Sequence, residues 1–358
     1  MTSAHDKIGS SDRKPKSPIK VMLVDDSVVA RSIFERILTQ TGQIEIVFQA
    51  EDSETALAAL GEHKVDIILL DIEMPERTGL EALPELLAKA GNAKILVVSS
   101  FAEENGPAAV KALALGACDT LAKPGRSGFS GKFSQILVDK VVRLGRPLRH
   151  KRDTALDIHD SISILDIERP ACIAIGASTG GIPAIFEVIS NLDPALDCPI
   201  FITQHLPDAF MPFFARQLSG QTSRIVSVAE KGGEVLSGHI YIAPGSAHLV
   251  CRKVGKKVYI DHLDHYPHSR YCPSVDAMFA SIAEIYGATV LAIILSGMGN
   301  DGTHGARLLS TARAKIIVQD QDSSVVWGMP GAVVREGLAS SILSPSGIVK
   351  LLATAAAA

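Results

Sequence analysis

Acidic, hydroxyl and lysine side chains recur in the first part of the chain, each directly after a short apolar run. They are Asp25-Asp26, Asp71, Ser99 and Lys123. Clustered carboxylates repel one another unless a hard cation binds them, and Mg²⁺ prefers such oxygen ligands. A carboxylate can also attack phosphorus to form an aspartyl phosphate, whose oxygens a lysine and a hydroxyl can bind. If these side chains converge, the pattern predicts a magnesium-dependent phosphoryl-acceptor pocket.

The second part of the chain contains one serine, one histidine and one aspartate in similar settings. Ser178 lies in GASTGG, which formally matches G-x-S-x-G, His205 lies in TQHLP, and Asp301 lies in LSGMGNDG. A serine becomes a nucleophile when a histidine accepts its proton and a carboxylate orients that histidine. Together the three residues predict an esterase or another acyl-transfer enzyme.

Each member of this set also has a plainer interpretation. A glycine-rich turn can bind phosphate, a histidine after a strand is often structural, and an aspartate before a helix can be an N-cap. The chain order Ser, His, Asp differs from the Ser, Asp, His order of the α/β-hydrolases. A binding domain without catalysis, and an esterase for a small soluble molecule, therefore remain as alternatives.

Alternating apolar and amphipathic segments predict the elements that position the first group of residues. Apolar runs at 19–24, 44–48, 65–70, 95–98 and 117–121 alternate with helical patterns at 27–40, 53–61, 80–89, 107–115 and 133–144. Continuous Val, Ile and Leu runs indicate strands buried on both faces, hence a doubly wound sheet of five parallel strands with five helices. Because ligands bind at the carboxyl ends of such strands, the polar residues are expected to converge.

The second half predicts another α/β domain with a parallel sheet. Buried runs occur at 171–175, 199–203, 288–295 and 316–318, and a small antiparallel insertion is expected where 249–252 and 257–260 form a hairpin across Gly255. Ser178, His205 and Asp301 each follow one of these runs. We therefore expect a disordered tail at 1–18, a first domain at 19–146, a linker at 147–169 and a second domain at 170–356.

Composition excludes several classes of function. The chain has 358 residues and a formal net charge of -4, which gives no basic footprint for nucleic acid. We expect no signal peptide and no membrane insertion, because the first residues are polar and no apolar run is long enough.

The five cysteines are predicted to be reduced and mostly buried. The histidine-rich segment 261–268 is predicted to be a surface loop rather than a metal site.

Residues 19–146 resemble the receiver domains of two-component signalling, most clearly in LLDIEMPERTGLEAL. The resemblance implies that Asp71 is the phosphorylation site. It further implies Mg²⁺ ligands and phosphoryl contacts: Asp25, Asp26, Asp71 and the backbone carbonyl of Glu73 for the metal, and Ser99 and Lys123 for the phosphoryl group. Thr120 stands where many receivers carry an aromatic switch residue, which puts the usual rotamer switch in doubt.

Residues 171–356 resemble the catalytic domain of chemotaxis protein-glutamate methylesterases. The matching stretches are GASTGG, TQHLP, GHIYIAPGSAHL, PSVDAMF, LSGMGNDG and QDSSVVWGMPGAV. The resemblance implies Ser178 as nucleophile, His205 as general base and Asp301 as its orienting acid. The backbone N–H of Met298, with help near Thr179, is the implied oxyanion donor.

This family resemblance also implies a reaction and its control. The expected reaction is hydrolysis of glutamate γ-methyl esters on methyl-accepting chemoreceptors, with release of methanol, and deamidation of glutamines on the same receptors. A chemotaxis histidine kinase is the expected phosphodonor, and the cytoplasm is the expected location. The esterase site should need no cofactor. The unphosphorylated receiver domain is expected to cover the entrance to the esterase site.

Overall fold

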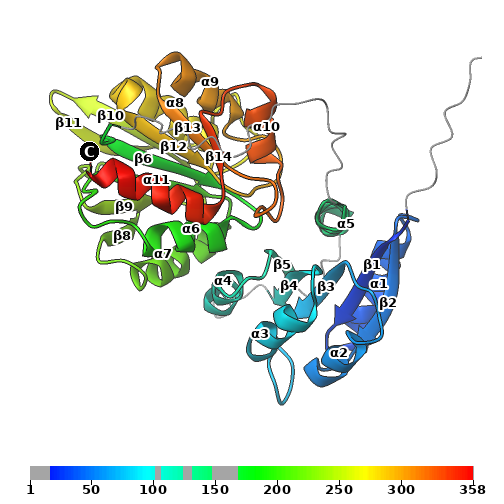
Figure 1. The fold of residues 1–358 in the computed structure, drawn as a ribbon. Coiled ribbons are helices and arrows are strands. Elements are labelled where there is room, and N and C mark those ends of the chain that lie inside the picture. The colour runs from blue at the N-terminus through cyan, green and yellow to red at the C-terminus, as the bar shows by residue number, and fades with distance from the viewer. Residues whose placement is uncertain (1–16, 101–105, 124–130, 147–167, 358) are drawn as a thin grey trace, which may run out of the picture.

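The computed structural model describes residues 17–100, 106–123, 131–146 and 168–357, which form two α/β units (Figure 1). All but two residues of the expected N-terminal tail, and all but two of the expected linker, lie outside these ranges. The first unit contains a five-stranded sheet, and the second contains a seven-stranded sheet with a separate two-stranded hairpin. The predicted fold class is confirmed for both units.

The first sheet has the strand order β2-β1-β3-β4-β5, and every pairing within it is parallel. Its strands are β1 (Ile19–Val24), β2 (Ile44–Ala50), β3 (Ile67–Asp71), β4 (Lys94–Ser100) and β5 (Asp119–Lys123). The alternating helices are α1 (Val28–Thr39), α2 (Ser53–Ala59), α3 (Gly79–Lys89), α4 (Gly106–Ala114) and α5 (Gly131–Gly145). This is the predicted doubly wound arrangement.

Capping residues set where the helices of this unit begin. Ser27 accepts a hydrogen bond from the Ala30 amide at the start of α1. Thr78 and Glu81 form a capping box at the start of α3. Such side-chain caps satisfy amide groups that have no partner within the helix. The loops between strand ends and helices are therefore held in place just where the polar residues lie.

The second sheet has the order β14-β13-β12-β6-β7-β9-β8 and is parallel throughout. Its strands are β6 (Cys172–Ala177), β7 (Ile200–Gln204), β8 (Ile225–Val228), β9 (His239–Ile242), β12 (Val290–Ile294), β13 (Lys315–Gln319) and β14 (Ser341–Leu343). The expected turn after β6 is confirmed, and the four predicted buried runs are confirmed as β6, β7, β12 and β13. The short edge strands β8 and β14 were not among the predicted runs.

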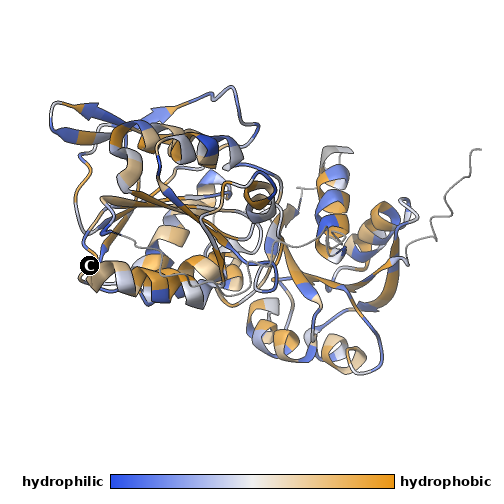
Figure 2. Ribbon diagram, turned by 45° about the horizontal axis from the view of Figure 1, so that its top comes forward, coloured by the Kyte–Doolittle hydropathy of each residue, from blue (hydrophilic) through white to orange (hydrophobic). Residues whose placement is uncertain are grey.

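Helices cover both faces of this sheet (Figure 1). On one face lie α6 (Gly181–Ser190), the short helix η2 (Asp208–Phe210), α7 (Met211–Ser219) and α11 (Pro345–Ala357). On the other face lie α8 (Val275–Tyr286), the short helix η3 (Gly287–Thr289), α9 (Thr303–Thr311) and α10 (Met329–Arg335). Figure 2 shows the strands between these layers as mostly apolar.

The predicted antiparallel insertion is confirmed as the hairpin of β10 (His248–Val254) and β11 (Lys257–Leu263). Both strands are longer than the alternation in the sequence suggested. The hairpin packs on α8, and the Cys251 amide donates a hydrogen bond to the Ser281 hydroxyl (3.1 Å). Leu249 and Ile260 are fully buried, so one face of the hairpin extends the core.

The two units share one apolar cluster. Buried side chains of α4, including Val110 and Leu113, belong to the same cluster as Ile185 of α6 and Phe214 of α7. At the first residue of α4, a Cβ on Gly106 would lie only 2.6 Å from the Phe213 ring, so the close approach requires glycine there. The first unit therefore packs firmly on the α6–α7 layer of the second.

Candidate active site and phosphoacceptor pocket

The structure brings the acidic residues of the first unit together at the carboxyl end of its sheet. Ligand oxygens of Asp25, Asp26 and Asp71 lie within 4.8 Å of one another. The Lys123 ammonium lies 2.5 Å from Asp71 Oδ2 and 2.7 Å from Asp25 Oδ2. Ser99 is buried on the neighbouring strand. Four of the predicted strand ends thus converge on one pocket.

The electrostatics of this pocket depend on burial and on Lys123. Burial raises the pKa of Asp71 to about 6, and the hydrogen bond and charge of Lys123 act in the opposite direction. The Glu73 amide donates a hydrogen bond to Asp71 Oδ1 (3.2 Å). Within the described residues, three carboxylates gather around one ammonium, so this arrangement favours binding of a further cation. The donor set consists of hard oxygen ligands and fits Mg²⁺.

Ser178 lies on the tight turn between β6 and α6. The Ser178 amide donates to the Ser296 carbonyl (3.0 Å), and the Gln204 amide group donates to the Ser178 carbonyl (3.0 Å). Gly180 has a φ of 75°, a left-handed conformation that favours glycine. These constraints fix the backbone of a serine that is only 8% exposed. The sequence predicted this turn, and the structure contains it.

His205 and Asp301 are in direct contact, as a general base and its orienting acid must be. His205 Nε2 lies 2.8 Å from Asp301 Oδ2. The backbone of His205 continues the pairing of β7 with β6, because its amide donates to the Ala177 carbonyl (3.1 Å). The backbone of His205 therefore lies next to the turn that carries Ser178. Since Nε2 faces Asp301, the second ring nitrogen is left to exchange a proton with a serine.

Asp301 is held by more donors than His205 alone. It accepts hydrogen bonds from the Val275 amide (2.7 Å), the Asp276 amide (3.2 Å) and the Ser274 hydroxyl (2.8 Å) at the start of α8, and from the Ser269 hydroxyl (3.2 Å). Burial acts to raise the pKa of Asp301, but the bond and charge of His205 and these donors bring it below its ordinary value. Asp301 is therefore a fixed anion.

Two amides beside Ser178 are free to bind a developing oxyanion. Within the described residues, neither Met298 nor Thr179 donates its backbone N–H to an acceptor. Gly297, just before Met298, approaches Ser178 so closely that a Cβ there would lie 3.0 Å from the serine Cβ. Unpaired backbone amides near a nucleophile can stabilise the oxyanion of a tetrahedral intermediate.

Tyr271 is a residue of this site that sequence reasoning missed. Its ring stacks on the His205 imidazole, with centroids 4.8 Å apart and planes 10° apart. Stacking of this kind holds the imidazole orientation, and an aromatic face attracts the imidazolium cation. No local pattern around SRYCPS marks the tyrosine, because the contact joins segments 66 residues apart in the chain.

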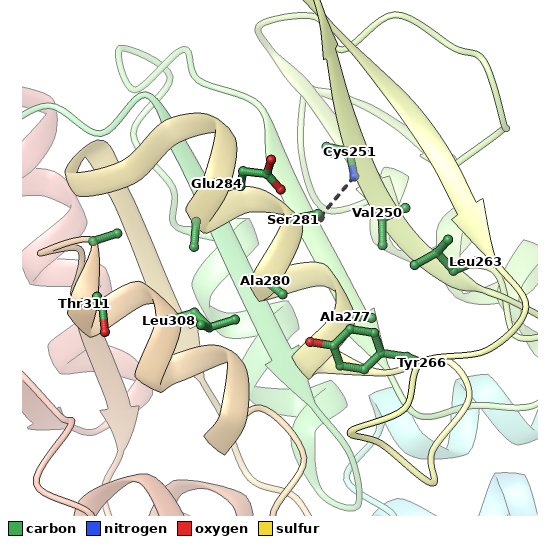
Figure 3. A pocket seen from close by; sticks show the side chains of 12 residues that line it. Val250, Cys251, Leu263, Tyr266, Ala277, Ala280, Ser281, Glu284, Leu308 and Thr311 are labelled. Atoms are coloured by element: carbon green, nitrogen blue, oxygen red, sulfur yellow. Dashed lines mark hydrogen bonds between the residues drawn. The ribbon is translucent and has the colours of Figure 1, made fainter.

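Two pockets open near the helices that flank Asp301. An apolar groove of about 610 Å³ lies between the hairpin and helices α8 and α9, where Ala277, Ala280 and Leu308 line it (Figure 3). It contains none of the three residues of the Ser178 site. A second, polar pocket of about 510 Å³ is lined by Tyr271, Asp276 and Asp301, among others. The polar pocket is thus the one that is lined by a residue of the Ser178 site, Asp301.

The histidine-rich segment ends beside this polar pocket. Its first three residues belong to β11, and the His268 ring stacks on His304 of α9 at 4.2 Å. Among the described residues, Asp25, Asp26 and Asp71 form the group of three metal-ligand side chains, and no such group includes these histidines. The predicted surface loop is therefore in part strand, because residues 261–263 complete β11 and only the remainder follows it.

The first unit contacts the turn that carries Ser178. The Gly180 amide donates to the Cys118 carbonyl (2.8 Å), and the Thr179 hydroxyl donates to Asp119 Oδ2 (2.6 Å). The Lys94 ammonium also donates to the Val325 carbonyl. These contacts come from the amino ends of β4 and β5, opposite to the acidic pocket. Strand β5 therefore has Asp119 at the Ser178 turn and its other end in the acidic pocket.

Comparisons with known proteins cover both units. The model of the response regulator receiver domain matches residues 21–128, and the model of the CheB methylesterase matches residues 173–352. The protein-glutamate methylesterase/protein-glutamine glutaminase 1 of Rhodospirillum rubrum is 37% identical over 357 residues, covering 91% of this chain and 92% of the relative. The corresponding enzyme 2 of Caulobacter vibrioides is 38% identical over 335 residues, covering 91% and 95%.

A solved structure supports the fold of the second unit. The crystal structure of the Thermotoga maritima CheB methylesterase catalytic domain is 36% identical in sequence, with a TM-score of 0.50. The match covers 51% of this chain and 97% of that chain. Within the described residues, none of the helices has the length and apolar character needed to cross a bilayer.

Proposed function

The chain belongs to the CheB family of protein-glutamate methylesterases, and on that premise we propose that Ser178, His205 and Asp301 hydrolyse glutamate γ-methyl esters on methyl-accepting chemoreceptors. The enzyme is a carboxylic ester hydrolase that carries its own receiver domain. The observation that carries the residue assignment is the 2.8 Å contact of His205 Nε2 with Asp301 beside the Ser178 turn. The same acyl chemistry serves the deamidation of receptor glutamines.

The proposed reaction begins when Ser178 Oγ attacks the ester carbonyl and His205 accepts the serine proton. The negative charge on the tetrahedral intermediate is stabilised by the free amides of Met298 and Thr179. His205 then donates the proton to the departing methanol. Water, deprotonated by His205, attacks the acyl enzyme and releases glutamate. For a glutamine substrate, ammonia leaves in place of methanol, and the later steps are the same.

We further propose Asp71 as the site of phosphorylation, with a chemotaxis histidine kinase as the donor. Asp25, Asp26 and Asp71, with the Glu73 carbonyl, would hold Mg²⁺, which when bound neutralises phosphoryl charge. Ser99 and Lys123 would contact the phosphoryl oxygens. The receiver domain is assigned to 19–146 and the esterase domain to 170–356, joined by a linker at 147–169. The protein would act in the cytoplasm.

The contacts at Thr179 and Gly180 support a mechanism in which the receiver domain controls the access of receptors to Ser178. In the unphosphorylated state the receiver domain is hydrogen-bonded to the two residues that follow the nucleophile. A bulky receptor helix could not reach Ser178 without moving these contacts. Phosphorylation of Asp71 would favour an arrangement in which they are broken, because a ligand shifts a conformational equilibrium by binding one state better.

The decisive experiment measures methanol release from methylated receptor membranes, with and without acetyl phosphate and Mg²⁺. We expect release that rises with the phosphodonor and disappears in Ser178→Ala, in line with the loss of several orders of magnitude when a triad serine is removed. Folded Ser178→Ala protein that still releases methanol would exclude the serine mechanism. Release from small soluble esters but not from receptors would instead favour the small-molecule alternative.

A further inference from the structure

The helices α8 and α9 begin side by side, and each is capped by a carboxylate from the other. Asp301, which precedes α9, accepts from the Val275 amide (2.7 Å) and the Asp276 amide (3.2 Å) of α8. Asp276, in the first turn of α8, accepts from the Gly305 amide (2.8 Å) in the first turn of α9. The first amides of a helix have no partner within it, so each aspartate satisfies groups that would otherwise be unpaired.

This reciprocal arrangement brings two buried carboxyl groups into contact. Asp276 is 4% exposed and Asp301 is 2% exposed, and both lie at the paired helix starts, where the Asp276 amide itself donates to Asp301 Oδ1 (3.2 Å). Two adjacent buried carboxylates cannot both ionise without a large cost, so one of them keeps a proton. His205 and the α8 amides stabilise the charge on Asp301. The proton therefore belongs to Asp276.

The surroundings of Asp276 agree with this placement of the proton. Burial, and next the charge of Asp301, raise the pKa of Asp276 to about 7, although the Gly305 and Gly302 amides act in the opposite direction. The other charged or titratable groups that face it or line its pocket are Tyr266, His268, Arg270, His304 and Arg307. Arg307 is engaged by Glu336 through two 2.6 Å contacts. The polar pocket gives the proton a route to water.

We propose that Asp276 is a positioning residue for the esterase, which as a neutral acid donates a hydrogen bond to Asp301 and thereby keeps that carboxylate aimed at His205. The inference rests on the proposed function, because it gives Asp301 the role of the orienting acid. At the same time Asp276 anchors the start of α9, and so the loop that carries Asp301. When Asp276 ionises, the donated hydrogen bond is lost and a second negative charge appears beside Asp301.

Two substitutions separate this role from a merely structural one. Asp276→Asn offers Nδ2–H to Asp301 and a carbonyl to Gly305, so it reproduces the neutral acid and should stay within about threefold of wild-type kcat/KM for methanol release at pH 6. Asp276→Ala removes both bonds, and its kcat/KM should fall about 10- to 100-fold through misplacement of Asp301. Both are measured in the full-length chain with acetyl phosphate and Mg²⁺.

The pH profile supplies the readout that a structural role would not change. As Asp276 ionises above about pH 7, wild-type kcat/KM should decline relative to Asp276→Asn, which has no such proton. The ratio of the variant to the wild type should rise at least threefold between pH 6 and pH 9. A constant ratio, or an Asp276→Asn activity as low as that of Asp276→Ala, would overturn the proposal.

Thermal unfolding tests the proton without any receptor. The pKa of Asp276 in the folded chain, about 7, is above the ordinary value of 3.8, so protonation stabilises the fold fully below about pH 4. This stabilisation is lost as the pH rises to about 7. The Tm of Asp276→Asn minus that of the wild type should therefore increase across this window, as followed by the fluorescence of the single tryptophan, Trp327.

The unfolding result stands apart from the proposed function. If wild-type protein released no methanol, the esterase assignment would fail, and the unfolding difference would still report whether Asp276 holds a proton. A Tm difference that stays flat from pH 4 to pH 8 would show that it does not, and the proposal would be wrong.

Discussion

The acidic pocket of the receiver domain and the Ser178 site of the esterase domain both lie at the carboxyl ends of parallel strands. They differ in how fully their charged groups are paired with partners. In the part of the acidic pocket that the structure describes, three carboxylates lie around one ammonium, that of Lys123. In the esterase site, Asp301 has four hydrogen-bond donors besides His205. A site whose charges are unbalanced responds to a ligand that balances them. A site whose reacting groups are already held in place is ready to react.

This difference shows how the two regions divide the work. A preorganised esterase cannot be controlled gently through its own geometry, because small displacements of the triad already cost much of its rate. Control of access leaves the geometry untouched. Strand β5 spans the distance between the two regions, about 13 Å for its five residues at the usual rise per residue. Lys123 stands at one end and Asp119 at the other.

The largest expected effect comes from removing the proposed phosphoacceptor, Asp71. Asp71→Asn has no carboxylate to attack the phosphodonor, so the ratio of methanol release with and without acetyl phosphate should fall to one. The assay is again methanol release from methylated receptor membranes, with Mg²⁺ present throughout. Stimulation that persists in this variant at the wild-type level would mean that the acidic pocket is not the switch, and the comparison of the two sites would lose its basis.

A smaller effect is expected where the two regions meet. Asp119→Ala removes the acceptor of the Thr179 hydroxyl, which should favour the open arrangement and raise methanol release without phosphodonor. A charge-assisted hydrogen bond contributes about 1.5 kcal/mol, so an increase of up to about tenfold is expected.

The matched control for Asp119 is Asp139→Ala. Asp119 pairs with the Lys140 ammonium as well as with Thr179, and Asp139 likewise pairs with a cation, Arg143, but it lies exposed on α5. The Asp139→Ala variant should release methanol without phosphodonor at the wild-type rate. If both variants changed release equally, the effect would come from net charge, and not from the contact with the Ser178 turn.

The smallest of these effects concerns the ring that covers His205. Tyr271→Ala should lower kcat/KM by about three- to tenfold, because the stacked ring no longer holds the orientation of the His205 imidazole. Tyr271→Phe keeps the ring and should behave like the wild type. If the two variants lose activity equally, the tyrosine hydroxyl is the important group, and stacking is not.

The sequence predicted most of the elements that place these sites, since each functional residue follows a continuous apolar run. Ser178 and His205 follow β6 and β7, and Asp71 ends β3, so strand patterns alone indicated which side chains share an edge. The family resemblance then assigned their roles. The presence and the burial of a strand follow from a local pattern of apolar residues, which is why this part of the prediction was confirmed.

What the sequence did not reveal depends on contacts between distant segments. Helix α9 has two glycines and a histidine in or just before its first turns, a weak helical pattern, and its start is fixed by Asp276 from another helix. Similarly, Asp119 and Tyr271 gain their importance only from Thr179 and His205 across the fold. Helix propensity and hydrophobic periodicity are local properties of the sequence, so they do not predict contacts between distant segments.

The apolar cluster shared by α4, α6 and α7 has a thermodynamic consequence for the switch. Any arrangement that separates the two domains exposes this apolar surface to water, and such exposure has a positive heat capacity change. Because the apolar contribution weakens on cooling, the closed arrangement is held less tightly in the cold. On the proposed control of access, we therefore expect inhibition by the receiver domain to weaken on cooling, and calorimetry with and without phosphodonor would measure this temperature dependence.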